Sequence, residues 1–425
     1  MRTSLSLITL VLISSGPSRG QGVDAALRDR VAQLVERLDS PKLETSKAAE
    51  EGLIKLGPRA LPLLPDSSKG GGAEREKRLG RVREALRAAA DKTNLGASKV
   101  TIRGKGLRLS EVLQQLQAQS ENVITDLREQ EGGESSNPAL DLELVDVPFF
   151  EALDRVAAKA EVTPNFYTGD GTIGLMPGKP AEGALVQLSG PFRIAFKQMA
   201  AVRDLQAGTA TANAQLEVAW EPRLRPMLLK LKVEELAVVD DRGKPVAPQV
   251  MNESTDVPLR PENPAAELNL NLAAPDRAAQ RLASLKVKAE VTVPAGLRTF
   301  RFASLAQAGV VLTQGDVRVT LESAEVDEQV WKVNVEVAYP GGGPAFESYR
   351  QGLFNNRLWL QKVDGSRFEH NGGFSNTASD GGKLGFEYLF VDAPGKPADY
   401  QFLYETPSEV RTIPLEFEFK DVPLP

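Results

Sequence analysis

The spacing of apolar residues changes along this chain. Between residues 23 and 92 they recur every three to four positions, whereas from about residue 185 onward they alternate with polar residues. The first spacing is typical of amphipathic helices, and the second is typical of strands with one buried face. The pattern therefore predicts a helical segment over residues 21–95 and a β-rich second half.

Three helices are expected in the N-terminal segment. The second ends at Gly57-Pro58, where glycine suits a helix C-terminus and proline cannot continue the helix, and the third runs from Glu74 to about Ala90. The run from Leu56 to Leu64 resembles the turn of HEAT-like repeats. Because about three such repeats are normally needed to bury a solenoid face, we expect a short helical cap. The first helix carries its apolar face at Leu27, Val31, Leu34, Val35 and Leu38.

Residues 99–178 contain one pattern twice: a β-like run, a short amphipathic helix and a second apolar run. The first copy starts at Val100 and the second at Leu140. Neither copy has enough apolar surface to fold alone, so we expect one α/β module in which both helices pack on strands from both copies. The residues expected to face this core are Val112, Leu113, Leu116, Phe150, Leu153, Val156 and Ala157.

The segments Leu107–Leu113 and Val145–Leu153 resemble the short N-terminal domain found ahead of secretins and of TonB-dependent signalling receptors. The resemblance implies a module that binds a partner and does not catalyse a reaction. A longer polar loop, Gln130–Pro138, departs from the compact pattern of that domain. No secretin or outer-membrane barrel pattern follows, so the usual downstream function does not carry over.

The β-rich half contains several short amphipathic strands separated by polar turns. Trp331–Tyr339 is the clearest, with apolar residues at every odd position. Such strands favour antiparallel β-sandwiches. We expect two of them, over residues 183–303 and 309–425, joined at Ala303–Gly309. The expected fold class is thus multidomain α+β, mainly β, and the candidate binding surfaces are the strand Leu216–Trp220 and the polar loop Asn252–Asp256.

The N-terminus has the features of a secretory signal peptide over residues 1–20. Arg2 supplies the positive charge, Leu5–Ile13 the apolar core, and Ser18–Gly20 a cleavage site before Gln21. The apolar run is too short to span a bilayer, and no later stretch is suited to do so. We expect export, to the periplasm or outside the cell, without an integral membrane segment in the mature chain.

The amino-acid composition limits the partners and the kinds of reaction that can be expected of this chain. The formal net charge of the 425 residues is -6 and no basic tract occurs, so nucleic acid is not an expected partner. With no cysteine and one histidine, the chain lacks thiol nucleophiles, disulfides and the usual zinc ligands. We expect His370 at an exposed strand end or loop, and we assign no catalytic, cofactor or metal site.

Two carboxylates could still act together as a catalytic pair. A glycoside hydrolase needs only two of them across a cleft, and no pattern singles out a pair among the candidates. Strand alternation places Glu336 and Glu418 on the solvent side. The Asp-Gly turns Asp240–Gly243 and Asp380–Gly382 lack the spacing of a calcium loop and are expected to be hairpin turns. The candidate acids are Glu217, Glu221, Glu234, Glu235, Glu347 and Glu387.

Tryptophans offer a test for sugar binding. Trp220 and Trp331 align with apolar neighbours and are expected in the core, whereas Trp359 alternates with Leu358 and Leu360. An exposed Trp359 could stack on a ligand, but burial is the expected outcome. The sequence predicts an exported, non-enzymatic interaction or scaffold protein with a protein partner in the cell envelope. The alternative is a glycan-binding module or a carboxylate-pair glycoside hydrolase.

Overall fold

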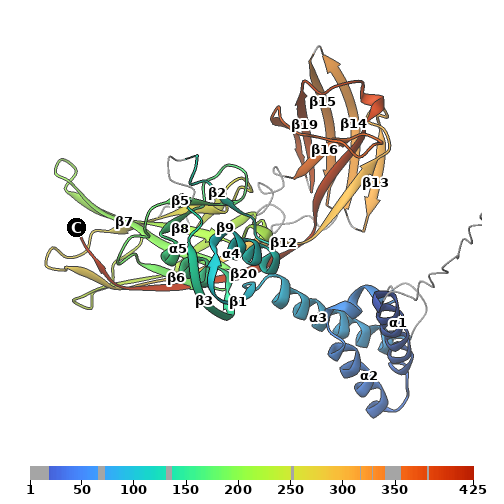
Figure 1. Ribbon diagram of the computed structural model, residues 1–425, viewed down its shortest axis with the longest axis horizontal. Helices are drawn as coiled ribbons and strands as arrows, with labels where there is room; N and C mark the ends of the chain where they lie inside the picture. The colour runs from blue at the N-terminus through green and yellow to red at the C-terminus, as the bar shows by residue number, and fades with distance from the viewer. Residues whose placement is uncertain are drawn as a thin grey trace, which may run out of the picture. The chain divides into compact units, whose positions relative to one another are not determined.

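The computed structural model describes residues 19–65, 72–130, 136–249, 253–315, 317–327, 329–339, 356–380 and 382–425. These fall into two compact units, Met1–Gly96 and Ala97–Pro425 (Figure 1). The chain is mainly β, with several antiparallel sheets and a smaller helical content. The predicted multidomain, mainly β α+β class is confirmed.

The first unit is helical. Its elements are α1 (Arg19–Arg37), α2 (Leu43–Lys55), the 3-10 helix η1 (Pro58–Leu63) and α3 (Ala73–Asn94). At the turn before η1, Gly57 has φ 75°, a left-handed value that favours glycine. The apolar faces meet in one core that includes Val31, Leu34, Leu38, Leu53, Val82 and Leu86.

The second unit begins with the duplicated segment. Its elements are β1 (Lys99–Arg108), α4 (Leu109–Ser120), β2 (Ile124–Asp126), β3 (Ala139–Pro148), α5 (Phe149–Ala160), β4 (Val162–Asn165) and β5 (Ile173–Pro177). Strand β1 pairs antiparallel with β3, while β5 pairs in parallel with β2 and antiparallel with β4. Each of these two sheets therefore joins strands from both copies, as expected for one folding unit.

Helices α4 and α5 share one core with both sheets. Leu113 and Leu153 are buried, and Phe150 packs edge-on against Phe166 with ring centroids 6.0 Å apart. Ala219 and Ala265, which come from a sheet beyond this module, belong to the same core. The apolar interior thus continues from the module into the next domain.

That domain is a sandwich of two sheets. One sheet has the order β11-β8-β7-β6, and the other is formed by β10, β9 and parts of β12 and β20. The full six-stranded order β10-β9-β12-β20-β16-β17 continues into the other β domain, where Leu358 and Leu360 share a core with Val333. The sheets face each other, since Phe196 and Phe419 meet edge-to-face at 5.4 Å. The strands are β6 (Val186–Ser189), β7 (Phe192–Asp204), β8 (Thr209–Trp220), β9 (Leu228–Asp240), β10 (Ser254–Pro258), β11 (Ala265–Ala273), β12 (Arg281–Phe302), β16 (Arg357–Gln361), β17 (Arg367–Glu369) and β20 (Gln401–Pro423).

The two longest strands belong to both β domains. β12 pairs with β20 from Arg281 opposite Pro423 to Phe302 opposite Phe402, with irregularities between Pro294 and Leu297. The end of the chain therefore completes the sheet of the preceding sandwich (Figure 1). This differs from the predicted division into residues 183–303 and 309–425, because the last strand crosses the boundary.

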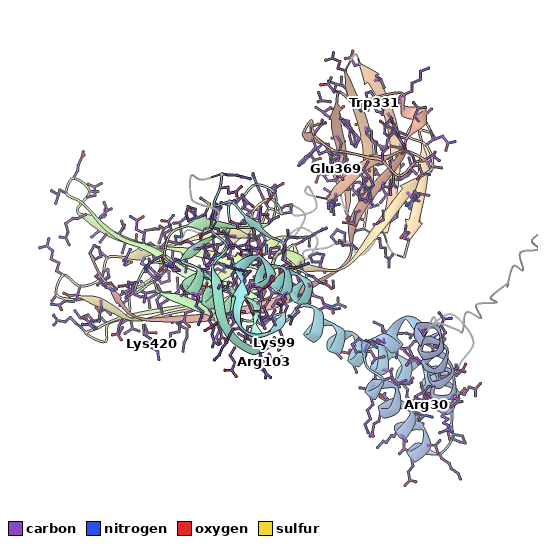
Figure 2. The ribbon with its side chains drawn as sticks, in the orientation of Figure 1. Arg30, Lys99, Arg103, Trp331, Glu369 and Lys420 are labelled. Atoms are coloured by element: carbon purple, nitrogen blue, oxygen red, sulfur yellow. The ribbon has the colours of Figure 1, made fainter. Side chains whose placement is uncertain are left out.

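The remaining strands form a five-stranded sheet in the order β13-β14-β15-β19-β18. They are β13 (Val310–Gln314), β14 (Val317–Asp327), β15 (Val330–Ala338), β18 (Phe374–Asp380) and β19 (Lys383–Val391). Trp331 on β15 is buried and packs edge-on against Tyr400 at 5.6 Å (Figure 2). The 3-10 helix η3 (Pro397–Asp399) leads into β20.

Leu153→Asp should unfold the α/β module. Leu153 is fully buried, and an unpaired charge in a core costs about 4 kcal/mol or more. Hydrogen exchange should show lost protection between Val100 and Leu175, with β14 and β15 unchanged. Val145→Asp is the matched control because Val145 on β3 is 46% exposed. Retained protection in the Leu153 variant would contradict the single-core account.

Candidate functional site

A buried carboxylate lies where the module meets the sandwich. The buried run Leu216–Trp220 carries β8 through the interior, and the next residue, Glu221, is fully buried. Ser98 precedes β1, and Asn122 lies between α4 and β2, so both side chains come from the module. The sequence therefore brings polar groups from two domains to one enclosed point.

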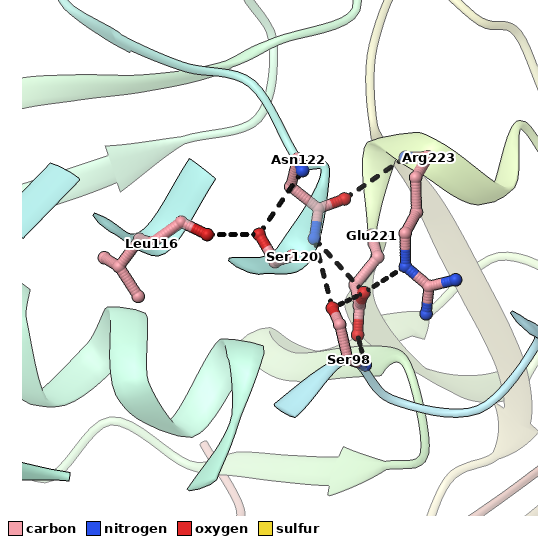
Figure 3. Close-up of polar contacts among 6 residues, drawn as sticks. All are labelled: Ser98, Leu116, Ser120, Asn122, Glu221 and Arg223. Carbon is pink, nitrogen blue, oxygen red and sulfur yellow. Dashed lines mark hydrogen bonds and ion pairs between the residues drawn. The ribbon is translucent and has the colours of Figure 1, made fainter. Parts of the chain in front are cut away.

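Both oxygens of Glu221 accept hydrogen bonds (Figure 3). The Ser98 backbone N–H donates to Oε1 at 2.9 Å, and the Ser98 hydroxyl donates to Oε2. Oε2 also accepts from Asn122 Nδ2 at 3.1 Å and from Arg223 Nε at 2.7 Å. A buried charge is tolerated when it is paired and hydrogen-bonded in this way.

Asn122 extends the network into helix α4. Its Oδ1 accepts from the Arg223 backbone N–H at 3.2 Å, and its own backbone N–H donates to Ser120 Oγ at 3.3 Å. Ser120 in turn donates to the Leu116 carbonyl at 2.7 Å. The arrangement joins two domains and leaves Glu221 enclosed, so this acid is suited to structure rather than to contact with a substrate.

Sequence reasoning named Glu221 only as one acid among several and missed Ser98, Asn122 and Arg223. A signal was present, since a carboxylate directly after five buried residues of a strand requires a partner. The identity of that partner was not visible, because Ser98 and Asn122 are about a hundred residues away in sequence.

Glu221→Gln should strongly destabilise the second unit. The substitution keeps the shape but removes the charge that pairs with Arg223, whose side chain is only 15% exposed. Breaking a buried pair in this way costs about 3–5 kcal/mol. Asp146→Asn is the control, because its 3.9 Å contact with Lys99 lies on the surface and is worth at most about 1 kcal/mol. Equal effects of the two substitutions in urea unfolding would refute this role.

A second ion pair lies close to the same interface. Arg193 on β7 donates from Nε to both carboxylate oxygens of Asp154 on α5, at 3.0 and 3.1 Å. Its guanidinium also lies 5.8 Å from the centre of the Phe166 ring. Burial raises the pKa of Asp154, and the positive charge of Arg193 opposes this effect. The module is thus fixed to the sheet at two polar points.

This raised pKa predicts a pH effect on stability. Because Asp154 has a higher pKa in the folded chain than its ordinary 3.8, its contribution is fully present below about pH 3.8 and is lost as the pH rises through the folded-state pKa. Urea unfolding of wild type and Asp154→Asn across this range should show a stability difference that falls with rising pH. A constant or rising difference would contradict the prediction.

A third group lies at the rim of the module. Burial, together with the charges of Glu217 on β8 and Glu267 on β11, raises the pKa of Tyr167. Lys197 on β7 approaches Glu217 at 3.6 Å. Glu217 lies directly opposite Glu267 of β11, so two like charges face each other on adjacent strands.

Among the predicted acids that the structure describes, Glu217 and Glu221 do not form a catalytic pair. Glu217 and Glu221 are four residues apart on extended chain, about 13 Å at the rise of a strand, whereas glycoside hydrolases need about 5–9.5 Å. Glu234 and Glu235 lie on β9, and Glu387 lies on β19. Glu347 is outside the described residues.

The other candidate groups serve the fold. Half-buried His370 follows β17, and its Nε2 lies 2.7 Å from the Gly373 carbonyl. Asp240 Oδ1 accepts from the Arg242 and Lys244 backbone N–H groups, so this turn uses its own carboxylate. Among the described residues, no group of three or more acidic or histidine side chains is placed to hold a metal ion.

All three tryptophans are buried: Trp220, Trp331 and Trp359. The expected burial of Trp359 is confirmed, at 6% exposure, although its neighbours Leu358 and Leu360 are buried as well. Arg357 and Arg367 lie over its ring, at 5.9 and 4.9 Å from the ring centre. Trp359 therefore provides no open platform for a sugar.

The candidate binding strand Leu216–Trp220 is not an edge. It belongs to β8, which pairs with β7 on one side and with β11 on the other, so this candidate strand has no open edge. Continuous burial on both faces is typical of an interior strand. Much of the predicted loop Asn252–Asp256 is strand β10, which begins at Ser254, and Asn252 lies outside the described residues.

Side chains of the module occupy its own sheet edges. Gln119 makes two hydrogen bonds with the Thr101 backbone of β1, at 2.8 and 3.1 Å. Gln117 accepts from the Ile124 N–H of β2, and Lys159 donates to the Asp141 carbonyl of β3. Strand β4 carries Pro164, which has no N–H. Such devices block the addition of a further strand.

A cleft lies near the irregular part of β12. Its lining includes Arg225, Leu259, Arg357 and Glu405. The single acid there, Glu405, is paired with Arg225 at 3.3 Å. Among the described residues of its lining there is no second carboxylate of the kind that glycoside hydrolysis requires.

Comparison of the chain with protein-family models, curated proteins and solved structures finds no match. None of the helices in the described parts is long and apolar enough to cross a bilayer. Function must therefore be argued from the surfaces that this fold presents.

Proposed function

We propose that the protein is an exported, non-enzymatic interaction protein of the cell envelope, periplasmic or secreted. In this proposal a module similar to the short N-terminal domain of secretins and TonB-dependent receptors is fixed on a β-sandwich that binds a protein partner. The observation that carries the proposal is an open strand edge on β7, next to the rigidly seated module.

The open edge covers residues 197–204. Strand β6 pairs only with Phe192–Ala195 of β7, and the Phe196 N–H donates to the Leu185 carbonyl. From there to Asp204, the described residues pair with β7 only on its β8 side. The segment contains no proline, and Val202 is 63% exposed. Such an edge can accept an extended strand from another chain.

The module supports this role by its position. Its own edges are blocked by Gln117, Gln119, Lys159 and Pro164, so the proposal places the partner strand on β7. The Glu221 network and the Asp154 pair hold the module against the same sheet. A partner would therefore meet a preformed surface, which lowers the entropic cost of binding.

Hydrolysis of glycans, the enzymatic alternative, has no supporting observation among the described residues. Of the predicted acids, Glu217 and Glu221 are too far apart for this reaction and Glu221 is enclosed, and the one acid among the described residues of the cleft is paired. Glycan binding without hydrolysis needs neither a second acid nor an exposed tryptophan.

The proposal predicts that protein from its native host lacks Met1 to about Gly20 and co-purifies with an envelope protein. Intact-mass measurement tests the first point, and pull-down with the mature chain tests the second. In the purified complex, hydrogen exchange at residues 198–204 should slow, because their free amides gain partners.

The two parts of this proposal, export and strand addition on β7, would be excluded by different results. Met1 retained in a cytosolic fraction would exclude export. A partner that binds without protecting residues 198–204 would exclude strand addition on β7, and amides of β18, a strand with a similar exposed edge, serve as the internal reference.

A further inference from the structure

The outer face of the β7, β8 and β11 sheet carries a block of carboxamides. In register, Gln198 lies opposite Gln215, which lies opposite Asn269. In the next row, Asn213 lies opposite Asn271. We call these five residues the amide face.

Alternation along the strands places all five on one side. Their neighbours Ala214 and Leu216 on β8, and Leu268 and Leu270 on β11, are buried toward the other sheet. The bulge between Phe196 and Gln198 shifts β7 by one position and so brings Gln198 onto the outer side. The amides are exposed or half-buried.

Their spacing makes a compact array. Neighbouring strands lie about 4.8 Å apart, and alternate residues of one strand lie about 6.8 Å apart. Asn213 Nδ2 donates to Asn271 Oδ1 at 2.9 Å. Within the described residues, the side chains of Gln198, Gln215 and Asn269 have no hydrogen-bond partner. Much of the donor and acceptor capacity of the array is therefore unused.

On the side of the amide face nearest the module lie two carboxylates, Glu217 and Glu267, and the aromatic ring of Tyr167. Glu217 and Glu267 face each other across β8 and β11, an arrangement that costs stability because the charges are alike. Such a like-charge pair on adjacent strands breaks the usual preference for opposite charges, and exceptions of this kind are expected at functional sites. Tyr167 is 44% exposed and lies near these two carboxylates, and Lys197 contacts Glu217 on the same side.

We propose that the amide face binds a neutral saccharide chain. A carboxamide offers both donors and an acceptor, which matches hydroxyl groups that are themselves both donors and acceptors. The exposed carboxylate of Glu267 can accept from further hydroxyls, and the Tyr167 ring can stack on a sugar. With Lys197 against Glu217 and Glu267, the face carries one excess negative charge, which disfavours acidic glycans.

A protein partner fits this face less well than the edge of β7. Protein interfaces have an apolar core with depleted charge, whereas the centre of this array is made of amides beside Ala200. The saccharide proposal uses the face of the sheet and is independent of strand addition at its edge. Either can fail while the other holds.

The test is a glycan array followed by calorimetric titration with a neutral hexasaccharide, chitohexaose or cellohexaose, and with an acidic galacturonate hexamer. The full chain should bind a neutral hexamer more tightly than the acidic one. Gln215→Ala and Asn269→Ala should each weaken binding about threefold to tenfold, the range of one lost hydrogen bond. Both side chains lie at the surface, so the melting temperature should not change.

Asn376→Ala is the matched control, since this exposed amide lies on β18 of the other β domain. Glu267→Gln should raise thermal stability by removing the like-charge pair and should weaken binding if its oxygens accept from the sugar. Absence of binding to every neutral glycan would overturn the proposal, as would affinities unchanged by the amide substitutions. Concentration-dependent association of the chain through this face would assign it to a second copy instead.

Discussion

The seating of the α/β module depends on one fully buried carboxylate, Glu221. A charge removed from water is stable only when paired and hydrogen-bonded, and here the partners come from both sides of a domain junction. Ser98 and Asn122 belong to the module, and Arg223 follows β8. Separation of the domains would remove the Ser98 and Asn122 hydrogen bonds to this carboxylate, so the network keeps the module and the sheet together.

The α/β module covers one part of the outer face of the β7, β8 and β11 sheet and leaves the rest uncovered. Beneath the module the face is small and apolar, at Ala219 and Ala265, and both residues join the core of the module. Farther from the module than Tyr167, the same face carries polar side chains that are exposed or half-buried. The strand edges differ in the same way. Side chains bond to the backbone at the edges of the module, whereas β7 continues beyond the end of β6 with one edge unpaired. The candidate binding surfaces therefore gather on the hairpin of β7 and β8 (Figure 1).

The two β domains are joined by shared strands. β12 and β20 remain paired through both, except at the irregularity near Gly296. Alternation of apolar and polar residues shows that each segment is a strand, but it does not show that the last residues of the chain return to an earlier sheet. The domain division predicted from sequence failed at this point because strand pairing joins residues more than a hundred positions apart.

Local spacing in the sequence determined which elements form and which of their side chains are buried. Leu268 and Leu270 are inside and Asn269 is outside, because successive residues of a strand point to opposite faces. Tertiary structure decided which strands are neighbours and in what register. It made Leu216–Trp220 an interior strand, covered Trp359 with arginines, and aligned the amides of three strands. Periodicity is a property of a few consecutive residues, whereas pairing and burial by another domain depend on contacts between distant ones.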